Sequence, residues 1–313
     1  MHYHHIKKSD NHSIHIVQLG IGLIGNCISD KISRLKGEHC EEITKVKIDW
    51  FDTDSILNQL KLLERSIDLN YKEDKIHIIW SAGKAGFSSD EKECNQEYLV
   101  FKKVIDFFNS SFCKACTQKF MYLFSSAGGL FEGEYVDNKH KTPKPKRPYG
   151  FLKLNQENYL IAKVNSFEKV YILRPSSVFS SNIFFKRLGI IGVLVSNGIL
   201  NQVTKIYGKE STIRDYILAE DIAAFVVDLI ENGNKEYDDP IFLISTEPVS
   251  IYRLKTIIEN IIDKPLLFQY LNFTNSENIF YHPNIKPSSL HTTPLIESIK
   301  ITKENFLKGQ FLS

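Results

Sequence analysis

The sequence predicts an α/β protein with a doubly wound parallel sheet and a smaller C-terminal lobe, and two observations support this fold class. The first is that short apolar runs, typical of buried strands, alternate with segments of helical period from residue 13 to residue 175. Strands that alternate with helices indicate a parallel sheet covered on both faces. The expected strands are residues 13–19, 44–50, 75–80, 119–124 and 170–173, and the expected helices are residues 23–35, 55–67, 90–108 and 149–162.

The second observation is that this alternation becomes irregular after Pro175. Residues 176–213 mix short elements with polar turns, and a strong helix (220–230), a buried strand (240–244) and another helix (251–262) follow. We therefore expect a first domain at residues 13–175, to which residues 214–246 return, and a second lobe formed by residues 176–213 and 247–313. The stretch between the first and third strands is short, so one strand–helix unit is expected to be reduced or missing.

The composition is that of an ordinary globular protein. The chain has 313 residues, enough to bury a sizeable core, and apolar residues make up 42% against 24% charged residues. Lys and Arg number 39 and Asp and Glu number 37, so the overall charge favours neither nucleic acid nor a membrane surface as a partner. Because no run of about 18 apolar residues occurs, no transmembrane helix is expected.

The N-terminal segment and the cysteines bear on the compartment. Residues 1–13 are polar and lack the apolar centre of a secretory signal, so we expect this segment, with His2, His4 and His5, to be a disordered tail. Five cysteines are an odd number and a poor disulfide framework, and the CxxC of Cys113 and Cys116 has no second pair with which to bind a metal. We therefore expect a cytoplasmic protein without a metal site.

A glycine-rich turn follows the first expected strand. Gly20, Gly22 and Gly25 form the pattern GxGxxG, and a helix is expected to begin at Leu23 and Ile24. The first glycine permits a tight turn, the second lets a pyrophosphate approach the backbone, and the third allows close packing of helix and strand. The bland alternative is a tight turn alone. The position between strand and helix favours a Rossmann-type domain that binds a dinucleotide, with these five residues around the pyrophosphate.

Acidic residues follow the second expected strand, where the adenosine ribose of a dinucleotide is usually bound. Asp49 lies 24 residues after Gly25 and Asp52 comes next, while residues 49–54 contain no Lys or Arg. A 2′-phosphate normally meets a basic side chain there, so the sequence favours NAD over NADP as the cofactor. The alternative is that these carboxylates cap the following helix.

Tyr149 and Lys153 are four residues apart at the start of an expected helix, so their side chains share one face. A phenol titrates at about pH 10 in model peptides, and a neighbouring ammonium favours the phenolate. Such a tyrosine can take a proton from a substrate hydroxyl. Ser125 and Ser126, at the end of the preceding strand, can orient the substrate. Taken alone, this spacing more often marks a surface pair on an amphipathic helix, and it is the surrounding motifs that favour the catalytic interpretation.

The ordered set of motifs resembles the extended short-chain dehydrogenase/reductases of the NAD-dependent epimerase/dehydratase family, and within it the UDP-hexose 4-epimerases. The resemblance covers about residues 14 to 260. It is carried by the glycine turn, residues 80–83 (WSAG), Asn95, residues 125–129 (SSAGG), residues 147–150 (RPYG) with Lys153, residues 174–178 (RPSSV), and residues 213–217 (IRDYI) with Asp221.

The resemblance implies roles for these residues. Tyr149 would be the catalytic base and acid, and Lys153 would hold the nicotinamide ribose. Ser126, or less favourably Ser125, would bond the reacting oxygen. Arg214 would clamp the diphosphate of the substrate, unless it pairs with Asp215 or Asp221. The remaining implied residues are Ala82, Gly83, Lys84, Asn95, Pro175 and Ser176 at the cofactor and Ser177 at the substrate, and the second lobe would bind the substrate.

Several positions depart from the family pattern. Ser177 stands where the epimerases usually carry Asn, and Leu19 occupies the first glycine of their GxxGxxG. The family's arginine-containing segment near the C-terminus has no clear counterpart here, where Lys286 is the nearest basic residue to Pro283 and Pro287. The 4,6-dehydratases place an acidic pair after the catalytic hydroxyl, whereas Ala127 and Gly128 follow here and cannot transfer a proton. The sequence therefore disfavours dehydration.

Three functions remain after this reasoning. The leading one is an NAD-dependent nucleotide-sugar epimerase, in particular a 4-epimerase of a UDP-sugar. The second is a keto-sugar reductase or dehydrogenase with exchangeable NAD(P). The third, from a different class, is a non-catalytic nucleotide-sensing protein, against which the intact Tyr149 and Lys153 argue. The expected partner is a nucleotide sugar, without nucleic acid or membrane, and a homodimer is left open.

Overall fold

The fold is described from a computed structural model of the chain. The structure describes residues 1–8, 13–35, 39–50, 52–67, 74–110, 112, 118–182, 188–233, 240–271 and 277–310. Cys113 and Cys116 lie outside these residues, so the CxxC interpretation stays a prediction. None of the described helices is long and apolar enough to cross a membrane.

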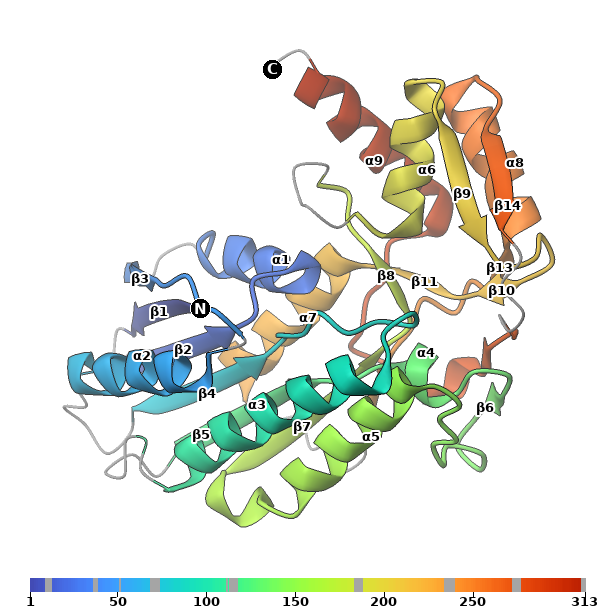
Figure 1. Ribbon diagram of the computed structural model, residues 1–313. Helices are drawn as coiled ribbons and strands as arrows, with labels where there is room; N and C mark the ends of the chain where they lie inside the picture. The colour runs from blue at the N-terminus through green and yellow to red at the C-terminus, as the bar shows by residue number, and fades with distance from the viewer. Residues whose placement is uncertain are drawn as a thin grey trace.

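A seven-stranded sheet forms the centre of the protein (Figure 1), in the order β12-β7-β5-β4-β2-β1-β3. Five of its strands run parallel, as the alternating pattern predicts. The parallel strands are β2 (Ser13–Leu19), β4 (Lys75–Trp80), β5 (Gln118–Phe124), β7 (Lys169–Pro175) and β12 (Ile241–Leu243). They are short and apolar because both faces of the sheet are covered.

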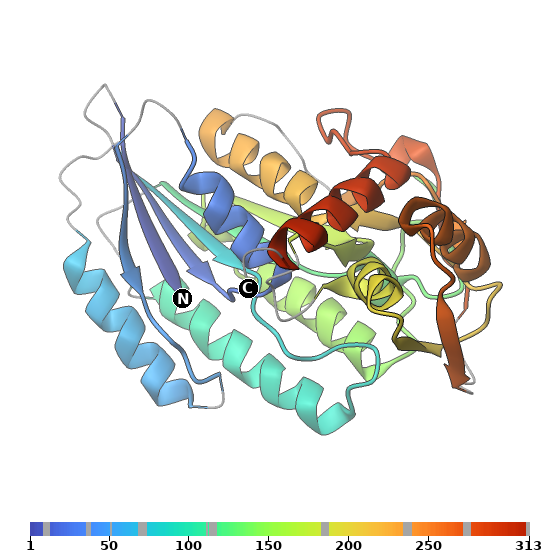
Figure 2. The same ribbon diagram turned by 90° about the horizontal axis from the view of Figure 1, so that it is seen from above.

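Helices cover both faces of the sheet, which makes the doubly wound fold (Figure 2). On one face α1 (Leu23–Ile32) packs against α7 (Ala219–Asn232). On the other face lie α2 (Thr53–Ser66), α3 (Glu91–Ser110) and α5 (Pro148–Ile161). Two separate clusters of buried apolar side chains fill the two layers between helices and sheet. The predicted Rossmann-type α/β class is confirmed.

The N-terminal segment corrects a prediction, because β1 (His2–Lys7) is a strand inside the sheet and not a disordered tail. It pairs antiparallel with β2 on one side and with β3 (His39–Lys45) on the other. Tyr3 lies in one apolar layer and Ile6 in the other, which is the alternation of a strand buried on both faces. His4 is buried and its ring contacts Ser29.

The second predicted strand is also corrected. It was expected at residues 44–50 beside the first strand, but β3 ends at Lys45 and is separated from β2 by β1. Residues 46–49 have no regular structure. Between β3 and β4 the described residues hold the single helix α2, and a reduced or missing strand–helix unit stays a prediction.

A smaller lobe stands beyond one end of the sheet, with its own apolar cluster (Figure 1). In it β9 (Val203–Tyr207) pairs in parallel with β14 (Leu267–Leu271). The lobe helices are α6 (Gly189–Ile199), α8 (Ile251–Ile262) and α9 (Leu295–Gln310). Short elements lie between sheet and lobe. Three of them are strand pairs: β8 (Ser177–Phe179) with β11 (Tyr216–Leu218), β10 (Ile213–Arg214) with β13 (Val249–Ser250), and β6 (Tyr135–Val136) with β15 (Phe280–Tyr281). The others are the helix α4 (Ala127–Leu130) and the 3₁₀ turn η2 (Pro283–Ile285), while a second 3₁₀ turn, η1 (Val164–Ser166), follows α5.

Candidate active site

The residues predicted for the site gather at one edge of the sheet, where the parallel strands end. The glycine turn follows β2, residues 81–85 follow β4, Ser125 and Ser126 follow β5, and Pro175 ends β7. In open parallel sheets ligands bind outside the carboxyl ends of the strands, at the point where the strand order reverses. Here that point lies between β2 and β4, so the glycine turn stands where a dinucleotide is expected.

The three glycines of the turn have distinct surroundings. Gly20 has φ +95°, and a Cβ there would lie 2.2 Å from the backbone nitrogen of Ala82. A Cβ on Gly25 would lie 2.1 Å from the carbonyl oxygen of Gly20. A Cβ on Gly22 would have nothing within 4 Å, so this glycine faces open space. Two glycines are therefore required by packing, and the third leaves the backbone accessible to a phosphate. Leu23 and Ile24 begin α1 and pack against the apolar layer beneath.

The acidic residues predicted for the adenosine end have different environments. Asp52 caps α2, and its carboxylate accepts a hydrogen bond from the backbone nitrogen of Ser55 at 2.9 Å, which is the alternative role considered for it. Asp49 is exposed, and its contact with the ribose stays a prediction. A cavity of about 410 Å³ lies beside the glycine turn, and its lining residues are Met1, His2, Ile21, Lys45, Val46, Lys47, Ile48 and Trp50. Because β1 lies between β2 and β3, the segment that carries Asp49 follows a strand that does not pair with β2.

Tyr149 and Lys153 lie on the first two turns of α5, which begins with Pro148 at its first position. Lys153 is buried, with 6% of its surface exposed, and its Nζ lies 5.7 Å from the centre of the Tyr149 ring. This Nζ donates to the carbonyl oxygen of Phe124 at 3.4 Å and to Oε1 of Gln156 at 3.2 Å. The ammonium is thus fixed beneath a half-buried phenol.

The two serines have different environments. Ser126 caps α4, and its Oγ accepts a hydrogen bond from the backbone nitrogen of Gly129 at 3.0 Å. The point where a Cβ on Gly129 would sit is 2.9 Å from Cε1 of Tyr149 and 3.4 Å from Oγ of Ser126. The structure therefore brings Ser126 next to Tyr149. The Oγ of Ser125 is buried and has no hydrogen-bond partner in the structure, so both hydroxyls stay candidates.

The other predicted cofactor residues are only partly brought to the site. Ala82 is buried and Gly83 has φ +150° in the loop after β4. Lys84 has an exposed side chain. Asn95 is exposed on α3, and its place at the cofactor stays a prediction. The residue of α3 that reaches the site is Glu97, whose Oε1 is 4.0 Å from Nζ of Lys153. Sequence reasoning missed it.

The segments after β7 and before α7 are joined through Asp215. Its buried carboxylate accepts hydrogen bonds from Oγ of Ser176 at 2.6 Å and from Oγ of Ser245 at 2.8 Å. The backbone nitrogen of Ser177, which is half-buried, donates to the carbonyl oxygen of Asp215 at 3.0 Å. Pro175, at the end of β7, is buried. Asp215 therefore holds the end of β7 in place.

Arg214 lies at the boundary of sheet and lobe. Its Nη1 donates to the backbone carbonyl oxygens of Ile213, at 2.8 Å, and Glu277. Burial lowers the pKa of its guanidinium. Asp215 and Asp221, the alternative ion-pair partners, accept hydrogen bonds from other groups; Asp221 accepts from the backbone and hydroxyl of Thr293 at 2.7 Å and 2.9 Å.

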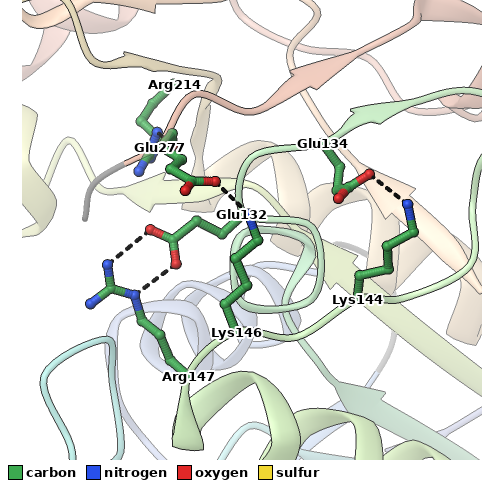
Figure 3. Close-up of polar contacts among 7 residues, drawn as sticks. All are labelled: Glu132, Glu134, Lys144, Lys146, Arg147, Arg214 and Glu277. Atoms are coloured by element: carbon green, nitrogen blue, oxygen red, sulfur yellow. Dashed lines mark hydrogen bonds and ion pairs between the residues drawn. The ribbon is translucent and has the colours of Figure 1, made fainter.

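Residues 139–148 (KHKTPKPKRP) form a basic, proline-rich loop before Tyr149, and ion pairs hold this loop in place (Figure 3). Nε and Nη2 of Arg147 donate to the two oxygens of the buried Glu132 at 2.7 Å and 2.9 Å. The loop is further held by the pairs Lys144–Glu134, at 2.9 Å, and Lys146–Glu277. Arg214 stands beside Glu277 in the same cluster. These contacts place cationic groups where the substrate side of the site meets the lobe.

Phe87 is a second residue that sequence reasoning missed. Its ring centre lies 5.8 Å from that of Tyr149, and the guanidinium of Arg147 lies 5.5 Å from it. Its side chain is 40% exposed. An aromatic ring at this place can pack against a substrate, but no sequence motif marks it.

The fold and the site together define a Rossmann-type protein with a tyrosine–lysine pair at the carboxyl edge of its sheet. Residues 43–244, well over half of the chain, match the model of the NAD dependent epimerase/dehydratase family. The chain therefore belongs to this family of enzymes, whose cofactor is NAD. No curated protein sequence matches the chain significantly.

Solved structures show the same fold. The UDP-glucose 4-epimerase of Thermus thermophilus, in complex with NAD, is 16% identical, with a TM-score of 0.71 over 94% of this chain and 98% of that chain. The UDP-glucuronic acid 4-epimerase of Bacillus cereus, in complex with UDP-glucuronic acid and NAD, is 17% identical, with a TM-score of 0.71 over 94% and 99%. The UDP-glucose 4-epimerase of Thermotoga maritima, with UDP-glucose, is 16% identical, with a TM-score of 0.68 over 95% and 99%.

Proposed function

We propose that the protein is an NAD-dependent nucleotide-sugar epimerase, in particular a 4-epimerase of a UDP-sugar. The observation that carries this proposal is the buried ammonium of Lys153 beneath Tyr149, with Ser126 beside the phenol and the glycine turn at the same edge of the sheet. The open space at Gly22 fits the pyrophosphate of NAD. The solved structures of similar fold with UDP-sugars support the choice of substrate.

The geometry supports a two-stage reaction. NAD, when bound, supplies the hydride acceptor for the first stage and the hydride donor for the second. Tyr149, as phenolate, would take the proton of the C4 hydroxyl as that carbon is oxidised to a ketone. After the keto-sugar has turned over, the same tyrosine would return the proton to the oxygen as the ketone is reduced from its opposite face. Lys153 keeps the phenolate charge favourable, and Ser126 or Ser125 orients the oxygen.

The charged groups around the lobe suit a nucleotide diphosphate. Arg214 is the proposed clamp, because a guanidinium binds phosphate oxygens in pairs. Ala127 and Gly128 follow Ser126 in α4 and cannot transfer a proton, so we favour epimerisation over dehydration. A cytoplasmic location, in which the unpaired thiols of Cys27 and Cys94 stay reduced, and a homodimer remain parts of the proposal.

Substitution of the proposed base tests the mechanism. Tyr149→Phe removes one oxygen and keeps the ring, so NAD should still bind, while turnover should fall by about 10²–10⁴-fold with the loss of the proton acceptor. The measurement is interconversion of UDP-glucose and UDP-N-acetylglucosamine with their C4 epimers. The matched control is Tyr252→Phe, which alters an exposed tyrosine on α8 and should leave turnover unchanged. Parent-like turnover of a folded, NAD-loaded Tyr149→Phe protein would end the proposal.

Two measurements together separate the remaining functions: mass spectrometry of small molecules released from the purified protein, and turnover assays. NAD found by mass spectrometry favours the epimerase. Net oxidation of NADH with a keto-sugar favours the reductase, and absence of turnover with every sugar nucleotide favours the non-catalytic sensor.

A further inference from the structure

The carboxylate of Glu97 enters the site from α3, beside Lys153. Only 13% of its side chain is exposed. Its Oε2 accepts hydrogen bonds from the backbone nitrogens of Lys84, at 2.9 Å, and Ala85, at 3.0 Å. Its Oε1 is buried and has no hydrogen-bond donor in the structure. One oxygen thus fixes the loop after β4, and the other points toward the site with its hydrogen-bonding capacity unused.

The direction of Oε1 is set by two neighbours. A Cβ on Gly83 would lie 2.6 Å from Oε1, so the carboxylate lies directly against the backbone of the loop after β4. On its other side Nζ of Lys153 is 4.0 Å away, too far for a hydrogen bond. Nζ already donates to Phe124 and Gln156, which leaves one of its three protons for another acceptor. Oε1 and this ammonium are therefore neighbours, and each has hydrogen-bonding capacity left over.

We propose that Glu97 is a cofactor-positioning residue, whose Oε1 accepts a hydrogen bond from a hydroxyl of the nicotinamide ribose and whose charge offsets that of Lys153. This inference rests on the proposed function. A buried carboxylate oxygen without a donor is costly, and a ribose hydroxyl held at Lys153 is a donor that would satisfy it. The same negative charge reduces the field with which the ammonium favours the phenolate of Tyr149.

Glu97→Gln isolates the free oxygen. The backbone nitrogens of Lys84 and Ala85 require an acceptor, so the amide oxygen takes the position of Oε2 and the amide NH₂ takes that of Oε1. The variant therefore keeps the loop but replaces an acceptor by a donor. Loss of a hydrogen bond to a charged group should weaken NAD binding by about 10- to 100-fold. Binding of ADP, which lacks the nicotinamide ribose, should not change. Isothermal titration with NAD and with ADP measures both.

Two controls make the outcome decisive. Gln96→Ala alters an exposed residue of the same helix that has no proposed role, and this variant should bind NAD like the parent. If Glu97→Gln loses ADP as well as NAD, the side chain acts only by holding the loop after β4, and the inference is overturned. Parent-like NAD affinity in the variant that retains ADP would overturn the inference. A parent that binds no NAD would instead overturn the proposed function.

The pH dependence of turnover provides a readout that a purely structural role would not change. Without the carboxylate, the ammonium of Lys153 acts on Tyr149 unopposed and the phenolate forms at lower pH. The acidic limb of the kcat profile of Glu97→Gln should therefore move down by about one pH unit, the lower end of what one neighbouring charge produces. Glu97→Asp should leave this limb near its original place. An unmoved limb in Glu97→Gln would contradict the electrostatic part of the inference.

Discussion

The two halves of the central sheet bury their polar groups in different ways. In the half that carries the catalytic helix, Arg174 of β7 donates to both oxygens of Glu157 of α5 at 3.0 Å and 2.6 Å, between the rings of Phe131 and Phe242. In the half that contains β1, β2 and β4, the buried polar side chains are mainly histidines with the amide of Gln18, and one carboxylate, that of Asp74, lies directly before β4. There His77 contacts the hydroxyl of Tyr122 at 2.9 Å.

We expect the two halves of the sheet to respond differently to pH. The buried pair of Arg174 and Glu157 fixes α5, and with it Tyr149, to β7 through two charge-assisted hydrogen bonds. Histidines titrate near neutrality, and burial resists their charging. The catalytic half is therefore expected to be held rigidly by charge, whereas the other half is expected to weaken in acid.

The largest effect is expected from breaking the buried ion pair. Glu157→Gln leaves the guanidinium of Arg174 without its counter-charge, and breaking one side of a buried pair costs about 3–5 kcal/mol. Urea unfolding measures the loss. The surface pair Lys144–Glu134 is the matched control, because exposed ion pairs contribute about 0–1 kcal/mol, so Glu134→Gln should unfold almost like the parent. Equal losses in the two variants would remove the contrast between buried and exposed charge.

The glycine turn belongs to the half that contains β1, β2 and β4, and substitutions in it can separate packing from cofactor binding. Gly25→Ala places a Cβ against the carbonyl oxygen of Gly20 and should cost about 1–3 kcal/mol of folding free energy. Gly22→Ala meets open space, so the melting temperature should stay near that of the parent while NAD affinity falls. Thermal unfolding and NAD titration of both variants check this. Similar destabilisation by the two substitutions would show that Gly22 is also a packing residue.

The smallest effect is expected from His77. Burial lowers its pKa from 6.5 to about 3, with a smaller contribution from the charge of Lys75. The unfolded chain then binds more protons than the folded one between these values, so stability is complete above pH 6.5 and falls as the pH decreases. At pH 5.5 the loss should be about 1.4 kcal/mol, one pH unit below the unfolded value.

His77→Phe tests this contribution, because the ring keeps its stacking on Phe120 and cannot be protonated. The free energy of unfolding of this variant should change less between pH 7.5 and pH 5.5 than that of the parent. His140→Asn, which alters an exposed histidine, should retain the parent's pH dependence. An unchanged slope in His77→Phe would assign the acid sensitivity to other groups.

The parts of the site that the sequence predicts lie on single elements. Tyr149 and Lys153 are one helical turn apart, and Ser126 ends a strand next to their helix, so spacing alone brings them together. To predict Glu97 from the sequence, one must know which face of α3 is turned toward the sheet. The family motif points to Asn95, but the buried face of the helix runs through Cys94 and Phe101, and helical period assigns Glu97, not Asn95, to that face.

The adenosine end was predicted less well because it depends on how distant segments pair. The period-2 alternation of Tyr3 with His4 and Ile6 is present in the sequence, but the histidines were counted as polar residues of a tail. Only the structure shows that this strand enters the sheet and displaces β3. The identity of the residues that face the adenosine ribose then follows from strand order, which no local motif encodes.

The position of β1 has a consequence for how the chain reaches its native state. Lys7 pairs with Ser13, so β1 and β2 form a hairpin between segments that are close in the sequence. By contrast, β2 joins β4 through residues that are far apart in the sequence, such as Leu19 and Trp80. Hairpins form in about 1–10 μs, and parallel pairing of distant segments is far slower. We expect β2 to be paired on one side before the rest of the sheet assembles. After the hairpin has formed, the other edge of β2 is still free to pair with β4. The remaining parallel strands, and the site at their carboxyl ends, would then assemble from this edge.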